Sequence, residues 1–152
     1  MEQYGKVFCF FGGQQVIILS DTVSGIIWRR HQIHLTTEQL PSELLYRIVS
    51  IMFRVIEDNK WNTWSLGPCK GPHNLQPGHI SQTCGLLDGN FFGVNLKSLS
   101  VPTLCISNLT TDVEFSLRMW SRDGGFVSLL GVIALHKFRQ VGGHVVVNNL
   151  PK

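Results

Sequence analysis

The chain has 152 residues, of which 43% are hydrophobic and 15% are charged, and its formal net charge is +3. This length predicts one domain, residues 1–152, with a core that buries roughly two-thirds of the unfolded surface. The 15 glycines and the few charged residues favour strands and turns over a helical bundle. With Arg29–Arg30 as the one adjacent basic pair, the sequence has no basic stripe, which argues against nucleic-acid binding.

Cysteine and histidine spacing gives no pattern for a metal or redox site. The four cysteines form no C-x-x-C pair, and His31 and His34 would face opposite sides of an extended strand, so we expect two ordinary histidines and no cofactor. The sequence shows no secretion leader and no membrane span, which predicts reduced thiols in the cytoplasm or nucleus.

The first third of the chain predicts strands. Lys6–Phe11 and Gln15–Leu19 are apolar runs separated by Gly12–Gly13–Gln14, which is typical of a hairpin. A third run, Gly25–Leu35, follows the polar turn Ser20–Asp21–Thr22 and alternates weakly.

The stretch Pro41–Asn59 fits two patterns. With a period of 3.6, one helical face collects apolar residues and Ser42 is an acceptable N-cap; the face consists of Leu45, Ile48, Val49, Met52 and Ile56. With a period of two, Val49, Ile51, Phe53 and Val55 alternate with their neighbours, and the run is rich in β-branched residues. The local pattern alone favours the helix.

The rest of the chain predicts strands broken by polar turns, as in an all-β barrel or sandwich. Trp61–Leu66 is one such run, and Gly67–His79 is a loop rich in glycine and proline. The remaining predicted strands are Val94–Leu99, Thr103–Ser107, Asp112–Trp120, Phe126–His136 and Gly143–Val147. In Asp112–Trp120, Val113, Phe115, Leu117 and Met119 alternate with polar residues and predict one buried face.

The nonapeptide Gly85–Gly93 reads GLLDGNFFG and predicts a tight turn between two apolar arms, with Asp88 at its tip. An ordinary hairpin with an exposed aspartate is one interpretation. The other comes from a resemblance: Gly85, Leu86, Leu87, Asp88, Phe91 and Gly93 resemble the third motif of the dUTPase family, from which Asn90 and Phe92 depart.

This resemblance implies an all-β fold, a dUTPase-like barrel or jelly-roll-like β-sandwich, and it turns the interpretation of Arg47–Ile56 from helix to strand. It also implies that Asp88 is a vestige of the group that activates water and that Phe91 is a vestige of the ring beneath the sugar. The other motifs are degraded or missing. Pro68–Cys69–Lys70–Gly71 lacks the phosphate-binding Arg and Ser, and Ser128 replaces the orienting Gln.

A chain that keeps this motif but lacks the other catalytic groups is similar to the dUTPase-derived early-region proteins of adenoviruses. The resemblance therefore implies a catalytically dead viral protein that binds host proteins in the cytoplasm or nucleus, although the terminal Leu150–Pro151–Lys152 does not fit a PDZ domain. It also implies a homotrimer, and self-association agrees with the low charge, nine Phe and four Trp. Trp28, Trp61, Trp64 and Trp120 are either interface anchors or, more commonly, core residues.

Two alternatives remain open. One is a divergent dUTP or related nucleotide pyrophosphatase, which would need Mg²⁺. The other is a small viral matrix-type structural protein, for which a helix between sheet segments, over Ser42–Asn59, is the natural expectation.

Overall fold

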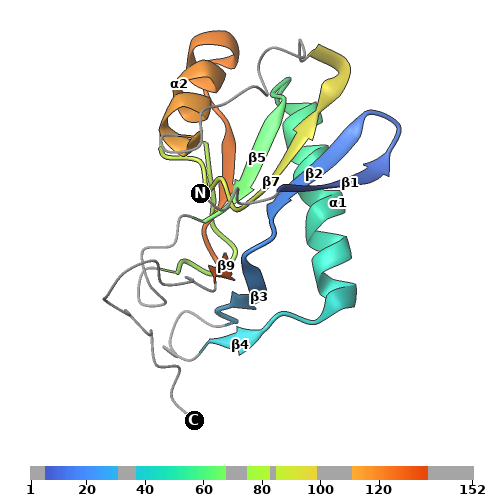
Figure 1. Cartoon of the computed structure of the whole chain (residues 1–152), viewed down its shortest axis with the longest axis vertical. Coiled ribbons are helices and arrows are strands. Elements are labelled where there is room, and N and C mark those ends of the chain that lie inside the picture. The colour runs from blue at the N-terminus through green and yellow to red at the C-terminus, as the bar shows by residue number, and fades with distance from the viewer. Residues whose placement is uncertain (1–5, 31–36, 68–74, 83–84, 99–110, 137–152) are drawn as a thin grey trace.

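The computed structural model describes residues 6–30, 37–67, 75–82, 85–98 and 111–136, which form two β-sheets and two long α-helices (Figure 1). The larger sheet has the strand order β1-β2-β7-β5-β8-β6 and the smaller sheet the order β4-β3-β9. The strands are β1 (Lys6–Gly12), β2 (Gln15–Ser20), β3 (Val23–Trp28), β4 (Glu38–Gln39), β5 (Thr63–Leu66), β6 (Ile80–Ser81), β7 (Phe91–Asn95), β8 (Val127–Leu129) and β9 (Val132–His136).

Pairing in both sheets is antiparallel except between β5 and β8, which are parallel. The predicted first hairpin is confirmed: β1 pairs with β2 across a turn in which Gly13 has a φ of 55°, a conformation that glycine adopts without steric cost. The predicted strand Phe126–His136 is interrupted at Leu130–Gly131, so that β8 and β9 enter different sheets. The predicted strands Thr103–Ser107 and Gly143–Val147 fall on residues that the structure does not describe.

The strand predicted over Arg47–Ile56 is wrong, because this segment belongs to the helix α1 (Ser42–Asp58). Its buried residues Val49, Met52, Phe53 and Ile56 recur with helical spacing. The helix ends where Lys60 adopts a left-handed φ of 59°, and the N–H groups of Lys60 and Trp61 donate to the carbonyls of Glu57 and Ile56. This is a Schellman ending. The 3.6-residue period therefore decided the local structure.

The strand predicted over Asp112–Trp120 is also wrong. This segment lies in the helix α2 (Thr111–Asp123). Phe115 and Met119 are buried and stand one turn apart, whereas Val113 and Leu117 are exposed. The alternation of apolar and polar residues suggested a strand with all four apolar residues on one buried face. In the structure only two of the four are buried, and they are four residues apart, which is the spacing of one helical face.

The two helices cover opposite faces of the larger sheet, as Figure 1 shows. In β2, Ile17 and Leu19 pack in the cluster that contains the buried residues of α1, whereas Val16 and Ile18 pack in the cluster that contains Phe115 of α2. Because the side chains of a strand alternate between faces, the sheet lies between two helical layers. The central strands β5 and β7 are accordingly buried at every position.

The predicted all-β, dUTPase-like barrel is therefore wrong. Among the described residues, both sheets are open and the chain contains two long helices. A sheet that is covered by a helix on each face buries its apolar side chains without closing on itself. Neither helix among the described residues is long and apolar enough to cross a membrane.

Candidate functional site

The segment Gly85–Gly93 forms a turn into β7 but no hairpin, since Gly85–Asp88 contains no strand. Asp88 is buried, with 6% of its surface exposed. Its Oδ1 accepts hydrogen bonds from the backbone N–H and the side-chain Nδ2 of Asn90, at 3.1 and 2.7 Å. The carbonyl of Asn90 in turn accepts from the N–H of Ser20 at 2.9 Å. Asp88 therefore fixes the turn that starts β7 beside β2.

Phe91 and Gly93 belong to the face of β7 that packs against α1. Phe91 is 5% exposed, and its ring centroid lies 6.1 Å from that of Trp64. Gly93 is the register partner of Trp64, and a Cβ on Gly93 would lie 2.2 Å from the indole Nε1. The glycine thus provides the space that the indole fills. The predicted nucleoside-binding role of Asp88 and Phe91 stays a prediction, but the structure places Phe91 in the core with its neighbour Trp64.

The outer surface of α2 presents large apolar side chains to solvent. Val113 is 50% exposed and Leu117 is 60% exposed, and they stand one turn apart on the same side of the helix. Leu86 is 49% exposed and precedes Leu87, whose N–H donates to the hydroxyl of Ser116 at 2.9 Å. This hydrogen bond holds the segment that carries Leu86 against α2. We refer to Leu86, Val113 and Leu117 as the α2 surface.

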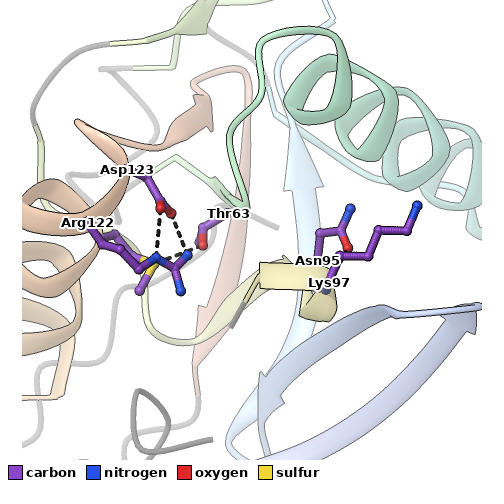
Figure 2. A network of polar contacts seen from close by, with 6 residues as sticks. Thr63, Asn95, Lys97, Arg122 and Asp123 are labelled. Atoms are coloured by element: carbon purple, nitrogen blue, oxygen red, sulfur yellow. Dashed lines mark hydrogen bonds and ion pairs between the residues drawn. The ribbon is translucent and has the colours of Figure 1, made fainter. Parts of the chain in front are cut away.

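The polar side chains described at the end of α2 make contacts within the helix and with the neighbouring strand β5. Figure 2 shows the Arg122 guanidinium bound to the carboxylate of Asp123, with distances of 2.7 Å from Nε and 2.6 Å from Nη2. Thr63 lies nearby on β5 and donates to the sulfur of Met119 at 3.1 Å. Lys97 projects away from this group in the same view. The contact between Thr63 and Met119 therefore joins α2 to the sheet, whereas the pair of Arg122 and Asp123 lies within the helix.

A hollow of about 430 Å³ is lined by Arg29, which follows β3 of the smaller sheet, and by residues 75–79, which precede β6 of the larger sheet. Its walls are tied together by hydrogen bonds to backbone carbonyls. Arg29 N–H donates to the carbonyl of Gly131 at 3.1 Å, and its Nη1 donates to the carbonyl of Leu75 at 3.1 Å. Leu130 N–H donates to the carbonyl of His79 at 2.9 Å. The cation of Arg29 thus holds the loop in place, which gives it a structural role at the hollow.

Within the described ranges, no three side chains of the metal-ligating types gather in one place. The predicted loop lysine Lys70 and the histidines His31 and His34 lie outside those ranges. Of the four tryptophans, Trp64 is fully buried and the other three are half-buried. The best-defined candidate for a functional site is therefore the α2 surface, which sequence reasoning missed because it placed Val113 and Leu117 on the buried face of a strand.

The fold defines a mixed α/β protein with an open sheet between two helical layers. No family model, no curated protein and no solved structure matches this chain. The dUTPase resemblance accordingly has no support from the comparisons, and the barrel that it implies is not the fold observed.

Proposed function

We propose that this chain is a non-catalytic protein-interaction domain that binds another protein through the α2 surface. The observation that carries the proposal is the exposure of Val113 and Leu117 on one side of a helix whose other side is part of the core. Large apolar groups that adjoin one another in solvent are characteristic of protein-binding surfaces. Leu86 is a further exposed apolar side chain, one residue before the Leu87 N–H that binds Ser116 of this helix.

The shape of the α2 surface specifies the chemistry of its partner. Val113 and Leu117 form a ridge along a helix, which fits an apolar groove in the manner of helix-in-groove recognition. The ion pair between Glu114 and Arg118 is partly exposed on the same helix and supplies a charged rim. We therefore expect a partner that offers an apolar groove with polar groups along its edge.

Substitution of Leu117 by serine tests the proposal. The matched control is Ile51→Ser on α1, because Ile51 is 53% exposed and Leu117 is 60% exposed. Tagged chains carrying each substitution capture proteins from a cell extract, and each captured protein is then purified and its affinity is measured by titration calorimetry. Burying the exposed part of a leucine is worth about 1–2 kcal/mol. Leu117→Ser should therefore lower the affinity for a protein that binds this surface directly by roughly five- to thirty-fold. Ile51→Ser should leave that affinity unchanged.

Two results would contradict this proposal: an affinity that is the same in Leu117→Ser and wild type for every purified partner, or an equal loss in Leu117→Ser and Ile51→Ser. Far-UV circular dichroism of both variants establishes that they are folded, so that a lost interaction reports on the surface. A lower affinity in Leu117→Ser than in Ile51→Ser places the binding site on α2, because the two substitutions change similarly exposed residues on different helices.

A second candidate function is that of a small structural protein that assembles with itself. One specific observation favours it: α1 is a helix between two sheet segments, which is the arrangement expected of that class. Light scattering of the purified chain distinguishes the candidates, because a structural protein grows into large assemblies with rising concentration and an interaction domain stays at a fixed small size. The homotrimer that the dUTPase resemblance implied stays a prediction.

A further inference from the structure

In the part of the chain that the structure describes, the strand β1 lies at one edge of the larger sheet and has a long unpaired side. Among the described residues it pairs with β2 alone. Its seven residues, at about 3.4 Å each, span roughly 24 Å. The strand at the other edge, β6, has only two residues. The backbone N–H and C=O groups along the outer side of β1 are therefore a template for another strand.

The sequence of β1 contains few of the features by which proteins protect such edges. Charged residues, prolines and bulges are the usual protection. Of the seven residues KVFCFFG, Lys6 alone is charged and none is proline. The one irregularity is a register shift between Phe10 and Gly12, at the end of the strand. The run Lys6–Phe10 is regular and open to pairing.

We propose that β1 is a self-association edge, at which two copies of this chain pair antiparallel about a two-fold axis at Phe8 or Cys9. The two six-stranded sheets then form one continuous sheet. A strand that pairs antiparallel with its own copy gives a closed, isologous dimer. In either register the two Lys6 residues are at opposite ends of the junction, so the only charges in β1 do not face one another.

A second layer of contacts supports the choice of a second copy as the partner. The two-fold axis is perpendicular to the sheet, so α1 of both copies lies on the same face. Phe11 at the end of β1 contacts Tyr46 of α1, with ring centroids 5.1 Å apart. Tyr46 is nevertheless 64% exposed. This exposed aromatic ring therefore borders the junction and becomes buried when the second copy docks.

Cys9 provides the test, because it is exposed and lies in the middle of β1. With the axis at Phe8 or Cys9, the two Cys9 side chains lie on the same face, directly opposite or as diagonal neighbours about 7–8 Å apart. We expect the full-length wild-type chain to dimerise in sedimentation equilibrium under reducing conditions at micromolar concentration. Cys9→Lys and Cys9→Glu should each raise the dimer dissociation constant roughly tenfold or more, because like charges then face one another. Cys9→Ser is the uncharged control and should dimerise as the wild type does.

Mixing the two charged variants is the decisive step. An equimolar mixture of Cys9→Lys and Cys9→Glu chains should form a heterodimer in native mass spectrometry, since the opposite charges then meet across the axis. Misfolding of either variant cannot produce this rescue. A wild-type chain that stays monomeric, charged variants that dimerise as well as Cys9→Ser, or a mixture without heterodimer would each overturn the proposal. The α2 surface belongs to the helix on the other face of the sheet from α1. A chain that does not dimerise through β1 would therefore leave the proposed function untouched.

Discussion

Replacing Gly93 by alanine tests the packing at the centre of the larger sheet. The new Cβ would lie 2.2 Å from Nε1 and 2.3 Å from Cε2 of Trp64. The indole cannot turn out to solvent at no cost, because Trp64 is 0% exposed and packs edge-on against Phe53 with centroids 5.6 Å apart. Inserting a methyl group into a well-packed core typically costs about 1–3 kcal/mol, so this contact predicts a loss of unfolding free energy of ~3 kcal/mol or more.

Urea unfolding followed by far-UV circular dichroism measures this loss. The control is Gly85→Ala, because a Cβ at Gly85 has no atom within 4 Å and should change the unfolding free energy by less than about 0.5 kcal/mol. A double-mutant cycle with Trp64→Leu isolates the contact, since the alanine at position 93 should cost about 2 kcal/mol less once the indole is gone. Equal stability of Gly93→Ala and Gly85→Ala, or strictly additive losses in the double variant, would refute the reasoning.

Two further substitutions test how each helix is held to the sheet, both by the same unfolding assay. Ser116→Ala on α2 removes the acceptor of the Leu87 N–H and should lower the unfolding free energy by about 1–3 kcal/mol, because it leaves a buried donor unsatisfied. The control is Ser121→Ala, because Ser121 is exposed on the same helix and its substitution should change the unfolding free energy very little. An equal effect of the two substitutions would contradict the anchoring role of Ser116. Phe53→Ala on α1 should cost about 3–5 kcal/mol, since Phe53 is 1% exposed in the core; a loss below about 1 kcal/mol would place α1 away from the sheet.

The N-terminal hairpin could be predicted from the sequence because its determinants are local. Gly12–Gly13 between two apolar runs specifies a turn and two strands, and β1 and β2 follow within one residue of the expected bounds. The helix α1 was also encoded locally, by the 3.6-residue spacing of its buried residues. The resemblance to the dUTPase family argued against that local pattern and led to the wrong prediction of a strand over Arg47–Ile56.

The helix α2 could not be predicted from alternation, because alternation does not report which residues are buried. Phe115 and Leu117 occupy equivalent positions in the period-two pattern, yet Phe115 is 1% exposed and Leu117 is 60% exposed. The candidate site was missed for the same reason. Its identification requires knowing that Val113 and Leu117 leave the core, which depends on where the helix docks and is a tertiary property.

The segment Gly85–Gly93 shows how one short motif fits two explanations. Its final glycine resembles part of a nucleotide-binding motif, whereas the structure relates Gly93 to the Trp64 side chain on the neighbouring strand. Asp88 likewise caps the turn through Asn90. Gly93 and Asp88 therefore both contact residues of this chain, Trp64 and Asn90. Of these two roles, the sequence predicted only that Asp88 lies in a turn.

The central claim is that the larger sheet lies between α1 and α2, so that Val113 and Leu117 on the outer side of α2 are exposed among the described residues. A single NOESY spectrum of the labelled chain tests it most directly. We predict contacts from Phe53 of α1 to Trp64 on one face, together with contacts from Phe115 of α2 to Phe92 on the other face. A spectrum in which Phe53 and Phe115 contact the same face of the sheet, or in which Phe115 contacts no residue of β7, would contradict the account.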